Sequence, residues 1–305
     1  MNTKFNRREL LTALSSLGVL GTLPAAATAG DVLPQRAIPG RRETLPIVGL
    51  GSTKPVRFIR EAGTAPVESV IRKLISYGGS VVDTSPRPPE LDARFGQVLQ
   101  QAEFRDALFI ATKITVFGKE QGIAQIEQTQ RLFGRDPLDL LQISSLTDLQ
   151  THWPTLREWK EAGKVRYIGV TVAHERLYET LETFMQRESP DFVQLNYSVM
   201  EYSAQERLLP LAADLGIAIL VNGPFMNGEF FAHVGGHDLP DWAADFDCES
   251  WAQYSLKYIL AHPAVTCVLT ETTKAQHMED NARAGLGRLP DDAMKRRMRD
   301  YTSGF

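Results

Sequence analysis

The amino-acid sequence predicts a single α/β domain folded as a (β/α)8 TIM barrel. Eight short apolar runs recur along the chain, and segments with the helical spacing of apolar residues separate most of them. Short runs that are apolar throughout are typical of parallel strands buried on both faces. Eight strand and helix units in one chain favour a closed barrel, and a doubly wound open sheet is the structural alternative.

The expected elements alternate along the chain. The strands are expected at Ile47–Gly51, Ser80–Thr84, Leu108–Thr112, Leu138–Ile143, Val165–Val170, Phe192–Asn196, Ile217–Val221 and Thr266–Leu269. The helices are expected at Ala65–Tyr77, Glu90–Ala102, Ile123–Phe133, Pro154–Ala162, Glu175–Arg187, Ala204–Leu215, Ser250–His262 and Thr273–Ala284. Gly134, Gly163 and Gly216 follow three of these helices, and glycine is the residue that most readily adopts the left-handed conformation past a helix end.

The first 29 residues are expected to be a signal peptide. Arg7 and Arg8 precede an apolar run from Leu10 to about Leu23, and small residues follow up to Ala29. A charged start, a short apolar stretch and a small-residue exit indicate secretion. The paired arginines indicate the twin-arginine route and therefore a periplasmic location. A membrane anchor is the alternative, but the run is short and contains glycine, serine and threonine.

Composition limits the remaining possibilities. The 305 residues carry 33 Lys+Arg against 37 Asp+Glu, a net charge of −4, which does not resemble the basic surface of a nucleic-acid-binding protein. No later segment has 18 consecutive apolar residues, so no membrane association is expected after cleavage. The expected organisation is a signal peptide at 1–29, a tether or short lid over the barrel floor at 30–44, and the barrel at 45–305. Cys248 and Cys267 are either two free thiols or one disulfide.

Candidate functional residues follow from the fold. In a (β/α)8 barrel the chemistry takes place at the C-terminal ends of the strands, so a small-molecule ligand is expected at that face. This rule selects the residues at the strand ends, which are Asp83, Lys113, Ser144-Ser145, Thr171, Gln194-Leu195-Asn196, Asn222 and Thr270-Glu271-Thr272. The sequence does not identify a protein partner.

Five motifs lie in order at successive strand ends. They are Val82-Asp83-Thr84-Ser85-Pro86, Ile110-Ala111-Thr112-Lys113, Asp139-Leu140-Leu141-Gln142-Ile143, Val165-Arg166-Tyr167-Ile168-Gly169-Val170-Thr171 and Gln194-Leu195-Asn196-Tyr197. With these motifs, the chain resembles the aldo/keto reductases from Leu45 to Asn281. The resemblance implies transfer of hydride from NADPH to a carbonyl carbon, with a tyrosine as proton donor assisted by a lysine, an aspartate and a histidine. Asp83 and Lys113 stand at the aspartate and lysine positions, although a structural ion pair is the alternative.

The other two catalytic positions differ from the family pattern. The tyrosine position is Pro88, and the histidine position is Ser144. Proline has no proton to give, and a serine hydroxyl is not an acid near neutral pH. General acid catalysis contributes about 10²–10⁴ in rate, so its loss should be severe unless another group substitutes.

The resemblance also implies where NADP(H) would bind. The corresponding cofactor residues are Thr171, Gln194, Asn222, Thr272, Lys274, His277 and Asn281. Val172 replaces the asparagine that usually contacts the nicotinamide amide. Glu271 places a negative charge near the expected 2′-phosphate, which is unfavourable, although Lys274 could offset it. The sequence therefore predicts a weakened NADP(H) site.

Three lesser features have two interpretations each. The segment from His233 to His237 is a solvated loop or, less favoured, a metal site, and no metal is expected. His152 is structural or a substitute acid. Arg87 and Arg94 lie on a solvated helix face or form an anion-binding mouth.

Two functions remain open. The first is a pseudoenzyme, a barrel kept for binding a small molecule or a partner. The alternative is an active NADP-dependent oxidoreductase that reduces a carbonyl substrate with a substitute proton donor. Export favours the first, because an exported protein cannot exchange spent NADP⁺ for NADPH.

Overall fold

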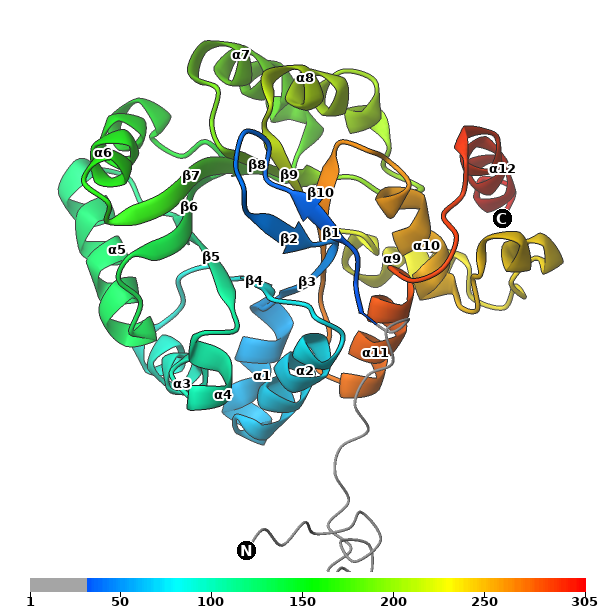
Figure 1. The fold of residues 1–305 in the computed structure, drawn as a ribbon, viewed down its shortest axis with the longest axis horizontal. Helices are drawn as coiled ribbons and strands as arrows, with labels where there is room; N and C mark the ends of the chain where they lie inside the picture. Colours follow the sequence, from blue (N-terminus) through cyan, green and yellow to red (C-terminus); the bar gives the residue numbers. More distant parts are fainter. Residues whose placement is uncertain (1–31) are drawn as a thin grey trace, which may run out of the picture.

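The computed structural model describes residues 32–305, and its central feature is a closed barrel of parallel strands (Figure 1). The strands follow the order β10-β3-β4-β5-β6-β7-β8-β9 around the barrel. Their bounds are β3 Val48–Gly51, β4 Val81–Asp83, β5 Phe109–Ile114, β6 Leu138–Ser144, β7 Val165–Val172, β8 Phe192–Asn196, β9 Ala218–Asn222 and β10 Val265–Thr270. The predicted single-domain (β/α)8 barrel is confirmed, and the doubly wound alternative is wrong.

Helices surround the barrel on its outer side (Figure 1). They are α1 Thr53–Ala62, α2 Ala65–Ser76, α3 Pro89–Leu99, α4 Ala102–Arg105, α5 Lys119–Phe133, α6 Leu149–Glu161, α7 Tyr178–Glu188, α8 Leu208–Leu215, α9 Glu229–His233, α10 Trp251–Leu260, α11 Ala275–Arg283 and α12 Asp292–Thr302. Four short 3-10 turns are η1 Glu175–Leu177, η2 Ser203–Gln205, η3 Met226–Gly228 and η4 Asp241–Phe246. In residues 32–305, no helix combines the length and the apolar character needed to cross a membrane.

Aromatic side chains fill the inside of the barrel. Phe109, Tyr167 and Phe192 belong to one buried cluster, in which the rings of Tyr167 and Phe192 pack edge to face at 5.4 Å. Aromatic pairs of this geometry contribute beyond the apolar area that they bury. The strands can therefore be apolar throughout, because one set of side chains packs inside the barrel and the other packs against the helices.

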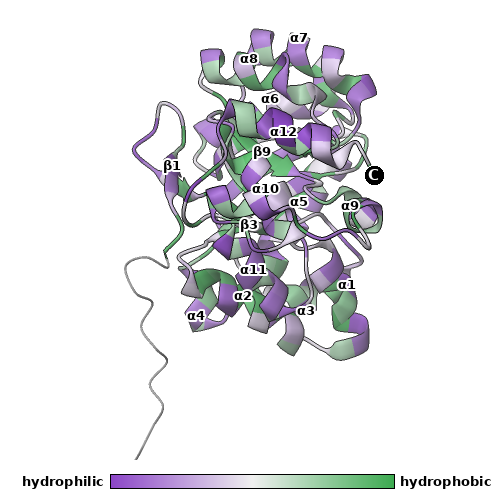
Figure 2. Cartoon of the chain, turned by 90° about the vertical axis from the view of Figure 1, so that its right-hand side faces the viewer, coloured by the Kyte–Doolittle hydropathy of each residue, from purple (hydrophilic) through white to green (hydrophobic). Residues whose placement is uncertain are grey.

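A β-hairpin closes the N-terminal end of the barrel. Its strands are β1 Gln35–Ala37 and β2 Thr44–Pro46, which pair antiparallel. Arg36 anchors it by donating hydrogen bonds to the backbone oxygens of Leu260 (2.5 Å) and His262 (3.1 Å). The side view places β1 at one end of the barrel and α9 at the other, which leaves the C-terminal strand ends free of the hairpin (Figure 2).

Several elements have no counterpart among the expected strands and helices, although a short lid was expected where the hairpin lies. These are the hairpin, α1, the insertion η3–α9–η4 after β9, and α12. In α12 only Lys295, Met298 and Thr302 are buried, so its sequence has almost no apolar period to detect. The predicted signal peptide lies outside the described residues. Cys248 and Cys267 are both buried free thiols, so they do not form the alternative disulfide.

Candidate functional site

A cavity of about 860 Å³ opens at the C-terminal ends of the barrel strands. Ten residues that the sequence predicted line it: Asp83, Lys113, Ser144, Ser145, Thr171, Gln194, Asn196, Asn222, Glu271 and His277. Three predicted cofactor residues lie outside its lining. Thr272 and Lys274 precede the helix α11, and Asn281 lies within it. Pro88 is exposed and precedes the first turn of α3, so it does not line the cavity either.

Asp83 and Lys113 form a buried ion pair between adjacent strands. The Nζ of Lys113 lies 2.5 Å from Oδ1 of Asp83 and also donates to the backbone oxygen of Thr84 at 3.0 Å. The Lys113 side chain is only 6% exposed. Burial lowers its pKa, Asp83 opposes this effect, and the nearby positive charge of Arg87 adds to it. This lysine therefore loses its proton more easily than an exposed one.

A chain of amide hydrogen bonds holds the second oxygen of Asp83. Gln194 on β8 donates from Nε2 to Oδ2 of Asp83 at 3.2 Å. The Oε1 of Gln194 accepts from Nε2 of Gln142 on β6 at 2.8 Å. Both ends of the Gln194 amide therefore have partners within the protein.

Arg87 lies buried beside the ion pair. Its guanidinium donates to Oγ1 of Thr84 at 2.7 Å and to the backbone oxygen of Ser85 at 2.8 Å, and it lies 3.7 Å from Asp92. Its side chain is 6% exposed, and burial lowers its pKa. The expectation that Arg87 lies on a solvated helix face is therefore wrong. Arg94 is exposed on α3, as the same expectation predicted. The packing of α3 against the strand end buries Arg87, which sequence spacing did not indicate.

Carboxylates outnumber cations around the cavity. Glu201, Glu229 and Glu271 line it together with Asp83, against Lys54 and Lys113. Sequence reasoning missed Glu201, because it lies in the loop after β8 and not at a strand end. Its carboxylate accepts two hydrogen bonds of 3.2 Å from Asn196, and burial raises its pKa.

Two phenylalanines from the insertion after β9 form an apolar wall of the cavity. The rings of Phe225 and Phe231 lie 4.9 Å apart, and both side chains line the cavity. Phe231 is 42% exposed, so part of its ring is open to solvent. Sequence reasoning did not find this wall, since nothing in the local pattern shows which face of a short loop helix meets the barrel.

The histidines outside the cavity have structural surroundings. His233 Nε2 lies 2.8 Å from the backbone oxygen of Thr302, and the ring of His237 stacks on Phe305 at 4.0 Å. Within residues 32–305, no group of three His, Cys, Asp or Glu side chains is placed to hold a metal ion. His152 is buried with its Nε2 2.8 Å from the backbone oxygen of Val116, away from the cavity lining.

Two features of the cavity bear on whether it could hold NADP(H). The amide of Gln194, which the resemblance assigns to the nicotinamide, already has partners at both ends. Glu271 accepts a hydrogen bond from the backbone nitrogen of Lys54 at 2.8 Å, which keeps a carboxylate in the cavity wall. The excess of carboxylates opposes a polyanionic nucleotide.

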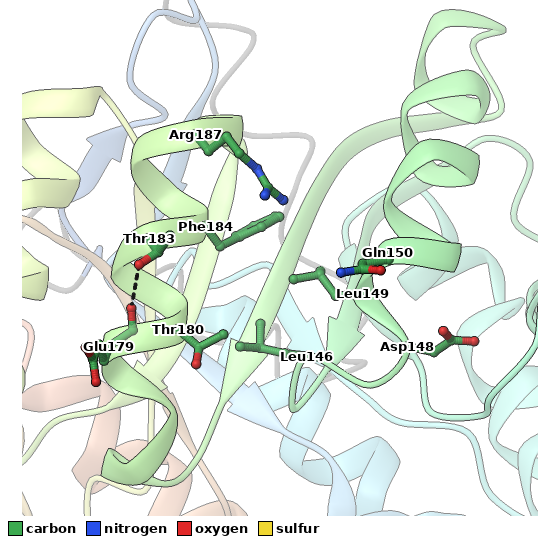
Figure 3. A pocket seen from close by; sticks show the side chains of 9 residues that line it. All are labelled: Leu146, Asp148, Leu149, Gln150, Glu179, Thr180, Thr183, Phe184 and Arg187. Atoms are coloured by element: carbon green, nitrogen blue, oxygen red, sulfur yellow. Dashed lines mark hydrogen bonds between the residues drawn. The ribbon is translucent and has the colours of Figure 1, made fainter.

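A second hollow lies between α6 and α7 (Figure 3). Its volume is about 610 Å³, and Phe184 and Arg187 of α7 point across it towards α6. Its full lining is Leu146, Asp148, Leu149, Gln150, Glu179, Thr180, Thr183, Phe184 and Arg187. None of the predicted site residues is among them, so the cavity at the strand ends is the better candidate site.

Comparison with known proteins gives a consistent result. The aldo/keto reductase family model matches residues 64–298. The aldo-keto reductase YhdN of Bacillus subtilis (strain 168) is 26% identical over 198 residues, 59% of each chain. The NADH-specific methylglyoxal reductase of Escherichia coli (strain K12) is 28% identical over 105 residues, 30% of this chain and 31% of that one. The chain thus matches about three fifths of the length of the first relative and about a third of the second.

Solved structures share the fold. The holo form of an aldo-keto reductase from Bacillus halodurans superposes with a TM-score of 0.71 at 17% identity, covering 88% of this chain and 96% of that one. An aldo-keto reductase from Klebsiella pneumoniae in complex with NADPH superposes with a TM-score of 0.71 at 19% identity, covering 90% and 96%. At these identities the similarity establishes the barrel alone.

Proposed function

The chain belongs to the aldo/keto reductase family, and from this premise we propose that it is a small-molecule-binding barrel that has lost reductase activity. One observation carries the proposal. Asp83 and Lys113 remain paired in the cavity, but no tyrosine is present among the described residues that line it. The positions that the resemblance assigns to the proton donor and the orienting histidine are Pro88 and Ser144.

The missing phenol matters because of the reaction's proton requirement. Reduction of a carbonyl places negative charge on its oxygen, and an acid must neutralise that charge. Ser144 can donate a hydrogen bond there but is not an acid near neutral pH. Without a substitute, the rate falls by about 10²–10⁴.

An active NADP-dependent oxidoreductase is the second candidate, and Glu201 favours it. Burial raises the pKa of this cavity carboxyl group, so it holds a proton at a higher pH than an exposed glutamate. A protonated carboxyl group in the cavity could replace the phenol as the acid.

We also propose weak NADP(H) binding and export to the periplasm by the twin-arginine route. The weak binding is supported by the engaged amide of Gln194 and the carboxylate of Glu271. Export is supported by Arg7 and Arg8 ahead of an apolar run. The two proposals agree, since NADPH is not regenerated outside the cytoplasm.

Steady-state kinetics with purified protein, NADPH and a panel of aldehydes and quinones test the function. We expect the wild type to turn over no faster than Lys113→Met. The exposed Lys119→Met is the matched control. NADPH-dependent turnover that is lost in Lys113→Met but kept in Lys119→Met would overturn the proposal. If that turnover were also lost in Glu201→Gln, Glu201 would be identified as the substitute acid.

A further inference from the structure

Lys113 has one hydrogen-bond acceptor fewer than the three N–H bonds of its charged form, and as many as its neutral form needs. A neutral ε-amino group has two N–H bonds and one lone pair. Within residues 32–305, Nζ has two hydrogen-bond acceptors, Oδ1 of Asp83 at 2.5 Å and the backbone oxygen of Thr84 at 3.0 Å. If both N–H bonds are directed to these acceptors, the lone pair has no partner in the protein. Lys113 lines the cavity, where a ligand can reach that lone pair.

A second cation lies next to Lys113. Arg87 donates to the Oγ1 of Thr84, the same residue whose backbone oxygen accepts from Lys113. The charge of Arg87 and the burial of Lys113 both lower the lysine pKa. Desolvation and an adjacent cation are the two means by which proteins make a lysine amine nucleophilic.

We propose that Lys113 binds small neutral aldehydes or ketones covalently and reversibly, as an imine. The inference rests on the proposed function, because it assigns a ligand class to the same cavity. A tyrosine between the lysine and the cavity would block access to Nζ, and none lines the cavity among the described residues.

The reaction balances without any oxidant or reductant. The lone pair of Nζ attacks the carbonyl carbon and forms a C–N bond, while the carbonyl π electrons move to oxygen. Asp83 accepts a proton from the attached nitrogen and returns it to the oxygen, which gives a carbinolamine. A second transfer through Asp83 lets the hydroxyl leave as water, so one carbonyl compound and one amine become one imine and one water.

The cavity wall favours neutral ligands over anionic ones. Glu201, Glu229 and Glu271 repel a carboxylate or phosphate group on the ligand. Phe225 and Phe231 offer an apolar surface to the rest of the molecule. An aldehyde therefore suits the cavity better than a keto acid of the same size.

Reductive trapping tests the inference on the full-length purified protein. Glycolaldehyde and sodium cyanoborohydride convert an imine into a stable amine, and peptide mass spectrometry locates the adduct. At pH 7 we expect Lys113 to be labelled faster than the exposed Lys119 in the same sample, because burial and Arg87 lower the pKa of Lys113 and each unit of lowering raises the neutral amine fraction about tenfold. Labelling of Lys113 that is equal to or slower than that of Lys119 would overturn the inference.

Two further measurements sharpen the result. The apparent pKa of the labelling rate at Lys113 should lie below the ordinary lysine value of 10.5, and a value at or above 10.5 would contradict an activated amine. Glyoxylate, the anionic counterpart, should label Lys113 more slowly than glycolaldehyde, and the reverse order would exclude the neutral ligand class. Lys113→Arg should lose the adduct, but the wild-type measurements stand even if this variant does not fold.

The outcomes for the function and the imine are separable. Absent NADPH turnover with no adduct at Lys113 overturns the imine and leaves the proposed function intact. NADPH turnover that depends on Lys113 overturns the proposed function whatever the trapping shows.

Discussion

Gln194 donates a hydrogen bond of 3.2 Å to Asp83 from β8 to β4, two strands that lie opposite one another in the closed barrel. The resemblance assigned Gln194 to the nicotinamide amide, but its Nε2 donates to the carboxylate of Asp83 instead. Asp83 is thus held from two sides, by Lys113 at one oxygen and by Gln194 at the other. The strand ends are joined into one polar network across the cavity floor.

Replacing Gln194 with leucine should destabilise the protein. The substitution leaves Oδ2 of Asp83 and Nε2 of Gln142 without their partners in a buried place. Unpaired buried polar groups cost about 1–3 kcal/mol each, so we expect the free energy of unfolding to fall by about 2–6 kcal/mol. Urea denaturation followed by circular dichroism measures it.

Gln150→Leu is the matched control, because Gln150 is exposed on α6. Its effect should stay within about 0.5 kcal/mol. Equal effects of the two variants would show that the amide of Gln194 does not contribute to the network in solution.

The Asp83–Lys113 pair should show strong coupling in a double-mutant cycle. Removing one partner leaves an uncompensated buried charge, and such changes cost about 3–5 kcal/mol. Asp83→Asn combined with Lys113→Met should therefore be less destabilising than the sum of the single variants. Chemical denaturation of the four proteins measures the coupling, and strictly additive effects would contradict a direct ion pair.

The barrel could be predicted from the sequence because parallel strands carry a strong signal. β8 has the predicted bounds, Phe192–Asn196, since both of its faces are buried and its run is apolar apart from Gln194 and Asn196. β5 extends two residues beyond its predicted end, to Ile114, because a lysine interrupts the apolar run there without ending the strand. The helix α12 could not be predicted, since its few buried residues set no apolar period.

The candidate site was predictable only where it coincides with strand ends. Asp83 and Lys113 follow from that rule, and the structure brings them together. Glu201 lies in a loop and Phe231 in the short helix α9 of an insertion, where position in the chain does not determine which side chains meet. The partner of Gln194 depends on what faces it across the barrel, which no local pattern encodes.

Export should depend on the paired arginines. Arg7→Lys with Arg8→Lys should retain the protein in the cytoplasm, because the arginine pair is the feature that the twin-arginine machinery recognises. Cell fractionation and immunoblotting measure the distribution, with Lys4→Arg as a control that leaves the pair intact. Continued export of the double variant would indicate the general secretory route instead.

His262 should make the protein less stable as the pH falls. Its ring lies 5.9 Å from that of Tyr197, and its Nδ1 accepts a hydrogen bond of 3.3 Å from the backbone nitrogen of Ala264, which requires the neutral ring. Burial and the charge of Lys295 lower its pKa from 6.5 to about 4. The unfolded chain therefore binds more protons between these two pH values, and stability is lost as the pH falls from 6.5 towards 4.

His262→Gln should remove this part of the pH dependence. The ring is partly exposed, so solvent screening reduces the effect. Between pH 6.5 and pH 4 we expect the free energy of unfolding of the wild type to fall by about 1–2 kcal/mol more than that of the variant. Urea denaturation at a series of pH values measures the difference. The exposed His277→Gln is the control and should follow the wild-type curve. If His262→Gln showed the same pH dependence as the wild type, the prediction would be wrong. The His262 ring would then bind protons equally well in the folded and unfolded protein, and Ala264 would not hold its Nδ1.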